Sequence, residues 1–416
     1  MVRAAIIMDT KNFISFMRKI SILLIGIALI AASAPACGKS AKGAKSPKLK
    51  IEWEAPVKVS AGGYGRVHAI SGDSLMACYS RGGNDYVRFS TDKGSSWSDE
   101  ILAMQGFEHT TDKGTATVRC ANPEFARLSA DNPHHPGRII LAANLRPKDN
   151  KSTVHPFSIV CSVSDDGGKN WSGQKSVYAS RLWDTDASKG AWEPFVLELP
   201  DGTVQIYFTD NTPYYAKGDK RGNNISVVES ADGGDSWGPA RIVCHSEGGW
   251  DGMPVVTLSS GRLYLVVEHK DIRGDYPMMI QCMSCTLDEN WPEEIPVNST
   301  RRFYPFGMGP AYEGAPYIIS TDKYFLVSCQ SAEGAEKRMT DSNSVPEVYV
   351  CPLSASSAES QWQWKKMSGG FRPMDIDQSR DNGLWNSLCD IGGDEILCVT
   401  QHKAQIFVTR GKISEK

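Results

Sequence analysis

Features that would assign the chain to a common enzyme class are missing from its 416 residues. No G-x-S-x-G element, phosphate-binding loop or dinucleotide fingerprint lies between a predicted strand and a predicted helix. A lone Cys-x-x-Cys, Cys282–Cys285, has no second pair at zinc-ligand spacing, so we expect neither a metal site nor a cofactor. The net charge of −3 gives no reason to expect a nucleic-acid partner.

Amphipathic helical periodicity is also absent after residue 37, where short apolar runs alternate with turn clusters. The 38 Gly, 22 Pro and 11 Trp suit many short strands joined by turns. Ten cysteines follow Cys37, most of them inside apolar, strand-like runs, and buried free thiols are the simplest interpretation. The composition therefore predicts an all-β protein.

The pattern Ser-x-Asp-x-Gly-x-x-Trp occurs three times, at Ser90–Trp97, Ser164–Trp171 and Ser230–Trp237. Asp and Gly supply the turn, and Trp is expected to pack between sheets. The copies are 74 and 66 residues apart, a step that suits one four-stranded propeller blade with its loops. Ser284–Trp291 is similar to a fourth copy that lacks the Gly.

Strand-like runs and turn clusters divide the rest of the chain into six units. We therefore predict a six-bladed β-propeller over residues 51–413, with Ile51–Trp53, or the segment just after it, closing the ring against the last strand. The six units cover about 50–102, 103–178, 179–243, 244–296, 297–365 and 366–413.

The first 37 residues have the character of an export signal. Arg18 and Lys19 precede the apolar run Ile20–Ala32, and small residues lead to Cys37. This arrangement resembles a bacterial lipoprotein signal, which would make Cys37 a lipidation site and the lipid the only membrane contact; secretion with cleavage nearby is the alternative. Residues 38–50 are rich in Lys, Ser and Ala and are expected to form a flexible tether.

Two carboxylic acids interrupt apolar strand patterns in the third and fourth units. Glu193 lies between Trp192 and Pro194, and Glu268 ends an apolar strand next to His269. An acid beside aromatic surface loses solvation, which raises its pKa and suits a general acid. Glu193 and Glu268 are 75 residues apart, about one blade, which predicts matching positions in adjacent blades.

The repeated Asp-containing pattern resembles the Asp-box, or BNR repeat, of the sialidase superfamily. Within that superfamily, an ordered set of short motifs is similar to glycoside hydrolase family 93, the exo-α-1,5-L-arabinanases. The motifs are Tyr64–Arg66, Ala121–Glu124, Trp192–Phe195 with Asp201–Gly202, Asp251–Pro254 with Val266–Glu268, Gly314–Pro316, Val327–Gln330 and Leu384–Ser387.

This resemblance implies a retaining glycosidase that uses two glutamates, which by motif are Glu193 and Glu268. The sequence leaves open which is the nucleophile. We favour Glu268, because His269 and strand-end amides would keep it ionised, with Glu193 as the acid/base. The residues expected to bind substrate are Arg66, Asn122, Arg146, Trp192, Trp250, Asp251, Gln330, Trp385 and Asn386.

Three of these expectations carry alternatives. Arg66 either contacts substrate or bridges blades. Arg146 suits a sugar-hydroxyl contact better than a carboxylate clamp. Asp251 either holds the nucleophile or a sugar hydroxyl, or forms a turn before Gly252. The tryptophans Trp192, Trp250 and Trp385 would supply a stacking platform for sugar rings.

Taken together, these features predict a monomer that cleaves an oligosaccharide or polysaccharide from its end. The first alternative is an exo-α-sialidase, which requires three arginines converging on one carboxylate and a Tyr nucleophile paired with Glu. Tyr304, Tyr312 and Tyr317 are the candidates for that Tyr. The second alternative is a glycan-binding propeller without catalysis.

Overall fold

The computed structural model describes residues 48–180, 190–215, 218, 222–270, 277–307, 311–332, 344–353, 364–370 and 382–415. By contacts the chain divides into two units, 1–47 and 48–416. The predicted signal segment 1–37 with Cys37, and most of the predicted tether 38–50, lie outside the described residues. No helix in the described ranges is long and apolar enough to cross a membrane.

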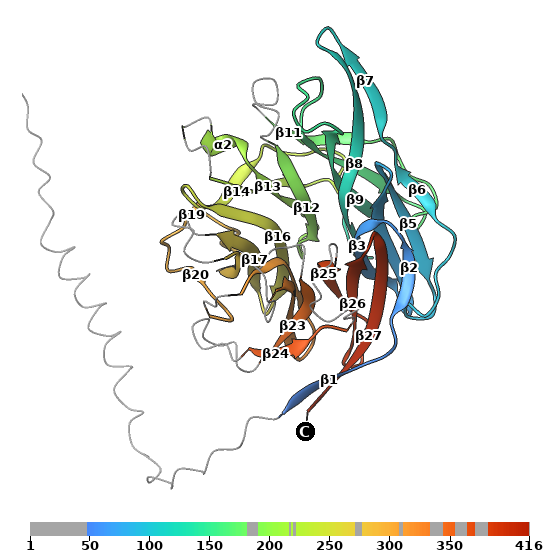
Figure 1. The fold of residues 1–416 in the computed structure, drawn as a ribbon, viewed down its shortest axis with the longest axis vertical. Coiled ribbons are helices and arrows are strands. Elements are labelled where there is room, and N and C mark those ends of the chain that lie inside the picture. The colour runs from blue at the N-terminus through green and yellow to red at the C-terminus, as the bar shows by residue number, and fades with distance from the viewer. Residues whose placement is uncertain are drawn as a thin grey trace, which may run out of the picture. The chain divides into compact units, whose positions relative to one another are not determined.

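The second unit is a six-bladed β-propeller, as predicted (Figure 1). Its strands form six mainly antiparallel sheets whose innermost members surround a common axis. Blade 1 contains β3 (Gly63–Ser71), β4 (Ser74–Arg81), β5 (Asn84–Ser90) and β6 (Ile101–Met104); blade 2 contains β8 (Gly114–Arg127), β9 (Ile139–Pro147), β10 (Ser158–Ser164) and β11 (Lys175–Ala179); blade 3 contains β12 (Ala191–Glu198), β13 (Val204–Asp210), β14 (Asn224–Ser230) and β15 (Arg241–His245).

The other three blades repeat this order from the axis outward. Blade 4 contains β16 (Trp250–Ser259), β17 (Arg262–Lys270), β18 (Met279–Thr286) and β20 (Arg302–Phe303); blade 5 contains β21 (Glu313–Ser320), β22 (Tyr324–Ser331), β23 (Val345–Pro352) and β24 (Lys365–Ser368); blade 6 contains β25 (Asn382–Asp390), β26 (Glu395–His402), β27 (Gln405–Glu415) and β1 (Leu49–Trp53). Outside this scheme are β2 (Val57–Ala61), β7 (Phe107–Thr111), α2 (Thr212–Tyr215) and β19 (Ile295–Pro296).

The ring closes where the sequence predicted. In blade 6, β1 pairs with β27, with Ile51 opposite Ile413, and β2 pairs with the other end of β27. Trp53 of β1 also donates its indole N–H to the carbonyl of Ser368 in blade 5, at 3.0 Å. The first strands of the propeller are therefore fixed by the last strand of the chain.

Each Asp-box is a self-contained turn at the outer part of its blade. In the first box, Asp92 accepts hydrogen bonds from the Ser90 hydroxyl and the Ser96 backbone N–H, at 2.8 and 2.9 Å. The amide of Gly94, at φ +87°, donates to the Ser90 hydroxyl at 2.8 Å. These donors lower the pKa of Asp92 to about 2. The turn is thus stabilised by its own residues.

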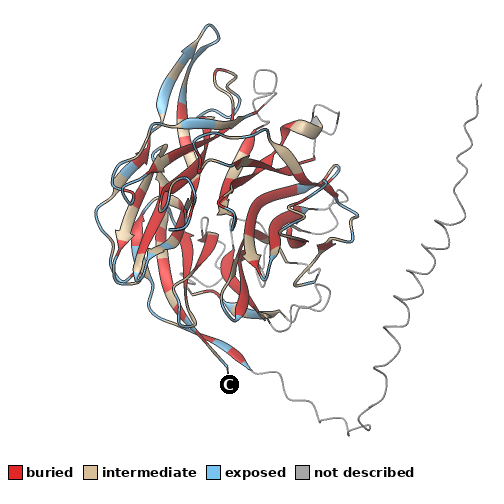
Figure 2. Ribbon diagram, turned by 180° about the vertical axis from the view of Figure 1, so that it is seen from behind, coloured by how far each residue is buried: buried red, intermediate tan, exposed pale blue. Residues whose placement is uncertain are grey.

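The altered fourth box retains its tryptophan contact without the glycine. Asn290 and Trp291 both adopt positive φ, and Trp291 is buried and donates its indole N–H to the Tyr207 hydroxyl of blade 3, at 2.9 Å. Apolar side chains pack between neighbouring blades, and the strands are buried while turns and the β7–β8 hairpin are exposed (Figure 2). The ten cysteines from Cys78 to Cys398 are buried free thiols, as predicted.

Candidate active site

All six innermost strands contain the same irregularity, which lies near the first residues in five of them and further along the longer strand β8. In each strand, the pairing with the second strand shifts, and one residue takes a left-handed conformation with φ between +46° and +57°. A β-bulge of this kind redirects the side chain it carries. The six bulge residues are Tyr64, Asn122, Glu193, Met253, Ala315 and Trp385.

Proline follows four of these six residues, at 123, 194, 254 and 316. Proline has no N–H to donate to a neighbouring strand, so it suits a point where the strand ladder is interrupted. Tyr64, Met253, Ala315 and Trp385 pack together as an apolar cluster. Asn122 and Glu193 are therefore the polar members of the bulge ring.

The carboxyl of Glu193 lies in a poorly solvated position. It accepts a 3.4 Å hydrogen bond from the Thr209 hydroxyl, which itself accepts the backbone N–H of Met253 at 3.0 Å. Burial and the nearby charge of Glu268 raise the pKa of Glu193 to about 8, against the smaller opposing effects of Thr209, Arg146 and Arg66. Glu193 is therefore mostly protonated at neutral pH.

Glu268 has donors that stabilise its ionised form. Its two oxygens accept hydrogen bonds from the Trp250 indole N–H at 3.2 Å and from the Ala315 backbone N–H at 3.0 Å. Gly252 and Gly314 allow this close approach, because a Cβ on Gly252 would collide with the Trp250 indole and one on Gly314 with the Tyr312 hydroxyl. The carboxylate is held against the backbone of two blades.

The two glutamates are neighbours, but they do not occupy matching positions, and that prediction was wrong. Glu193 is the bulge residue of an innermost strand, β12, whereas Glu268 is on β17, a second strand, opposite Gly252. The side chain of Glu268 reaches the Ala315 backbone N–H of blade 5. Two glutamates one blade length apart in the sequence are therefore brought together from two different strand positions.

Asp251 belongs to a buried ion pair behind Glu268. Its carboxylate is fully buried and contacts Arg302 through both oxygens, at 2.7 and 3.2 Å, and the imidazole of His269 at 2.8 Å. Burial alone would raise its pKa, but the charge of Arg302 and the His269 hydrogen bond lower it to about 2. Asp251 is fully enclosed and cannot touch a sugar hydroxyl, so the substrate-contact expectation is wrong.

Below the bulge ring, buried side chains meet across the axis. The Tyr317 hydroxyl of blade 5 donates to Glu124 of blade 2, the opposite blade, at 3.1 Å. Arg66 contacts Glu124 at 3.4 Å, and His68 is hydrogen-bonded to the other Glu124 oxygen at 2.7 Å. We call this layer the floor; it comprises Arg66, Glu124, Phe195, Val255, Tyr317 and Ser387, all buried.

The floor corrects the expectation for Arg66, which bridges blades and does not bind substrate. Its guanidinium also donates to the carbonyls of Gly65 and Trp385 and is 2% exposed. Arg302 is likewise committed to Asp251. A sialidase-type arginine cluster therefore does not form from Arg66 and Arg302, and Tyr317 is enclosed in the floor.

Two further expected substrate contacts are buried and support backbone instead. Gln330 donates to the Tyr312 hydroxyl at 2.8 Å and accepts the Trp385 backbone N–H at 2.9 Å. Asn386 donates to the carbonyls of Cys329 and Gly383. Both residues fix the Trp385 bulge from behind, so neither reaches a ligand in the funnel.

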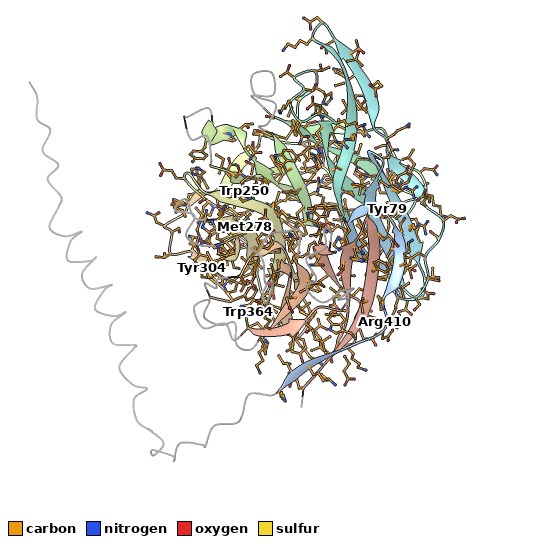
Figure 3. All side chains as sticks on the ribbon, viewed as in Figure 1. Tyr79, Trp250, Met278, Tyr304, Trp364 and Arg410 are labelled. Carbon is orange, nitrogen blue, oxygen red and sulfur yellow. The ribbon has the colours of Figure 1, made fainter. Side chains whose placement is uncertain are left out.

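The remaining predicted contacts keep part of their surface exposed. The Trp192 indole donates to Asn211 at 2.5 Å, and Arg146 lies over the Trp192 ring at 5.1 Å. Trp250 is 37% exposed at the start of β16, where Figure 3 labels it. Trp385 packs against Tyr64 at 6.0 Å between ring centres. Asn122 is half-buried in the bulge ring.

Comparison with known families gives a direct assignment for residues 40–302, which match the model of the BNR repeat-like domain. The match extends over more than half of the chain. The chain belongs to the BNR repeat-like domain family. The matched part of this BNR repeat-like protein includes the three Asp-boxes, Glu193 and Glu268, whereas blades 5 and 6 supply the supporting residues Ala315 and Trp385. No curated protein matches the sequence.

Solved structures share the propeller of this BNR repeat-like protein at low sequence identity. The α-L-arabinofuranosidase of Fusarium graminearum in complex with an iminosugar inhibitor has a TM-score of 0.59 and 14% identity, covering 87% of this chain and 98% of that one. The α-L-arabinanase of Penicillium chrysogenum, complexed with arabinobiose, has a TM-score of 0.56 and 16% identity, covering 88% and 98%. A Hadza microbial sialidase has a TM-score of 0.50 and 16% identity, covering 85% and 66%.

Sequence reasoning missed residues in this BNR repeat-like protein that have no motif of their own. Thr209 connects Glu193 to the Met253 bulge, but a Thr inside an apolar strand gives no signal. Asn144 is fully buried on β9 with neither amide atom partnered, two residues from Arg146. The bulge residues Tyr64 and Met253 had a signal, since each precedes a Gly or Pro at the start of a buried strand.

Proposed function

We propose that the protein is an exo-acting, retaining glycoside hydrolase that releases sugar from the end of α-1,5-linked arabinan or a related oligosaccharide. The observation that carries this proposal is the pair of neighbouring glutamates in contrasting environments. One is protonated at neutral pH through burial and like charge, and the other accepts two N–H donors. Two carboxyl groups, one that donates a proton and one that attacks, are what retaining glycoside hydrolysis requires.

In the proposed mechanism, Glu193 donates its proton to the leaving oxygen while the Glu268 carboxylate attacks the anomeric carbon. The glycosidic C–O bond breaks as the bond from carbon to Glu268 forms. Glu193, now ionised, then takes a proton from water, whose oxygen displaces Glu268 and regenerates both groups. Trp192, Trp250 and Trp385 would pack against the sugar, with Asn122 and Arg146 contacting its polar groups.

Product identification tests the proposed substrate. The protein is incubated separately with linear arabinan and with sialyllactose, and the released sugars are separated by chromatography. We expect a short arabinose product from the arabinan end. Free sialic acid would overturn the proposal in favour of the sialidase alternative, and no release from either substrate would favour a binding role or another glycan.

Chemical rescue tests the two roles. Azide is added to Glu268→Ala and Glu193→Ala with an activated arabinoside, and the configuration of the glycosyl azide is determined. We expect an inverted azide from Glu268→Ala, because azide then attacks from the vacated face of the sugar, and a retained azide from Glu193→Ala. The reverse pattern would exchange the two roles.

We also propose that the protein is exported as a monomer and anchored through a lipid on Cys37. The basis is the sequence alone: the apolar run that precedes small residues and Cys37. Metabolic labelling with a radioactive fatty acid should mark the wild-type chain and not Cys37→Ser. Label in Cys37→Ser, or none in the wild type, would contradict the anchor.

A further inference from the structure

Two arginines lie directly opposite each other on the strand pair that rises from the bulge ring. Arg119 of β8 is in register with Arg146 of β9, so both side chains point to the same side of the sheet. Neither has a carboxylate within ion-pair distance in the described part of the chain. Arg119 donates to the Lys148 carbonyl at 2.9 Å, and Arg146 to the Asn150 side chain at 3.3 Å.

This arrangement is electrostatically unfavourable in the free protein. Like charges directly opposite on paired strands repel each other. Burial and the charge of Arg119 lower the pKa of Arg146, with Glu193 as the opposing influence. The Nε atom of Arg146 is also buried without a hydrogen-bond partner. A bound anion between the two guanidinium groups would remove both the repulsion and the unmet donor.

A pocket of about 630 Å³ opens beside Arg119 on the same face as the bulges. Arg119, Lys148 and Phe107 line it, together with one carboxylate, Glu108. The β4–β5 turn, Gly82–Gly83, borders this pocket. The turn follows Ser80, which pairs with Gly63 at the start of β3, so the pocket lies on the side of the bulges. The β7–β8 hairpin above it projects from the propeller (Figure 1).

The wall of this pocket offers an apolar ring as well as cations. Phe107 is 39% exposed, and its ring is supported edge-on by His109 and His155, at 6.3 and 5.7 Å between ring centres. A sugar presents an apolar face that packs on such a ring. From Arg119 the path continues through Arg146 to Trp192, which flanks Glu193. Arg146 thus connects the arginine pair with the acid/base side of the site.

From these contacts we infer that Arg119 and Arg146 form a subsite for a uronic acid residue, which is an anionic sugar. This residue belongs to the leaving group of the substrate, the part that Glu193 protonates. The guanidinium pair binds the carboxylate, and Phe107 packs against the ring. The placement in the leaving part of the substrate rests on the proposed function, whereas the binding of an acidic sugar does not. Arg146 then clamps a carboxylate, contrary to the sugar-hydroxyl contact expected from its sequence context.

Calorimetric titration with two matched probes tests the subsite. The probes are methyl α-D-galactopyranosiduronate and methyl α-D-galactopyranoside, which differ only in the carboxylate. We expect the charged probe to bind about tenfold more tightly to the wild type, and this preference to disappear in Arg119→Gln. Arg127→Gln, the same change at the other end of β8, is the control and should retain it.

Equal binding of the two probes, or a preference that survives in Arg119→Gln, overturns the inference. Inorganic sulfate that displaces the charged probe at equal concentration would indicate a general anion site and also overturn it. Folding is checked by thermal unfolding, where Arg119→Gln should be at least as stable as the wild type because it relieves the repulsion. The titration measures binding and not hydrolysis. A failure of arabinan hydrolysis would therefore leave the subsite intact, and a failure of probe binding would leave the proposed hydrolysis intact.

Discussion

The pKa of Glu193 is raised by burial and by the charge of Glu268, and the Thr209 hydroxyl is the largest opposing influence. Because the proposed mechanism needs Glu193 protonated, kcat/KM should hold up to about pH 8 and decline above it. Thr209→Val removes the donor to the ionised form, so the pKa of Glu193 should rise by roughly half a unit to one unit. The measurement is the alkaline limb of the pH–rate profile.

Thr209→Ser is the matched control, since it keeps the hydroxyl and should leave the alkaline limb in place. The two variants separate the loss of the hydroxyl from a change in side-chain size, because only the valine lacks a donor to Glu193. An alkaline limb that moves to lower pH in Thr209→Val, or that moves equally in both variants, would contradict the assignment of Thr209.

Asp85 is a buried acid whose pKa affects stability. Its side chain is fully buried, one carboxyl oxygen has no partner, and burial raises the pKa to about 7 against the Ser80 hydrogen bond. A raised folded-state pKa means that stability is fully present below the unfolded value of 3.8 and is lost as pH rises towards 7. Asp85→Asn should therefore stabilise the protein at pH 8, by as much as ~4 kcal/mol.

The check is the melting temperature of Asp85→Asn and wild type at pH 5 and pH 8. The variant should gain most at pH 8 and roughly two fifths as much at pH 5, because pH 5 already lies above the unfolded pKa. An equal gain at both values, or a loss at pH 8, would show that the carboxyl of Asp85 is not protonated in the folded state.

At the scale of elements, Arg302 joins strands of blades 3 and 4. It pairs with Asp251 and also donates to the carbonyls of His245 and Ile295, which belong to the parallel pair β15–β19. Asp251→Asn would leave a buried guanidinium without its counter-charge, at a cost of about 3–5 kcal/mol. Adding Arg302→Met should recover part of this loss, measured by denaturant unfolding of the single and double variants.

The pH dependence of this pair has the opposite sign to that of Asp85. The pKa of Asp251 is lowered to about 2, so its contribution to stability is present above about pH 4 and is lost as pH falls towards 2. A double variant less stable than Asp251→Asn alone would contradict the idea that the unpaired charge causes the loss.

The elements also show why sequence reasoning brought Glu193 and Glu268 together but misjudged the surroundings of Arg66, Asp251, Gln330 and Asn386. A polar residue that interrupts an apolar strand marks either a funnel position or a support behind it. The two differ by one residue in register, which turns a side chain to the other side. Inserted bulge residues change that register, and their exact position depends on pairing between strands far apart in sequence.

For the whole molecule, the Asp-box spacing and turn clusters predicted the six blades, because each blade is a local meander with its own turn chemistry. Ring closure was also predictable, since it requires only that the first and last strands of the propeller pair. The contact between Tyr317 and Glu124 was not predictable. These two residues are 193 positions apart in the sequence and meet across the axis only after all six blades are placed.

Substitution of a single glycine should weaken the closure of the ring. Gly411 of β27 lies against the Trp53 ring, and a Cβ there would collide with it. Gly411→Val should displace β1 and lower the melting temperature by several degrees, because the closing strand contributes both hydrogen bonds and packing. Gly173→Val is the control, because no atom lies within 4 Å of a Cβ at that position.

Equal melting temperatures for the two valine variants would contradict a stabilising role for β1. Limited proteolysis adds a second measurement: cleavage within residues 48–61 should be faster in Gly411→Val than in Gly173→Val.

The floor affects how substrate enters the site and how product leaves it. Among the described residues, Arg66, Glu124 and Tyr317 close the axis below the bulge ring, so a released sugar would leave on the side of the bulges. Under the proposed activity, the shortened polymer must dissociate before each product escapes. The enzyme would then act distributively, shortening all chains of a population in step instead of digesting one chain to completion before the next.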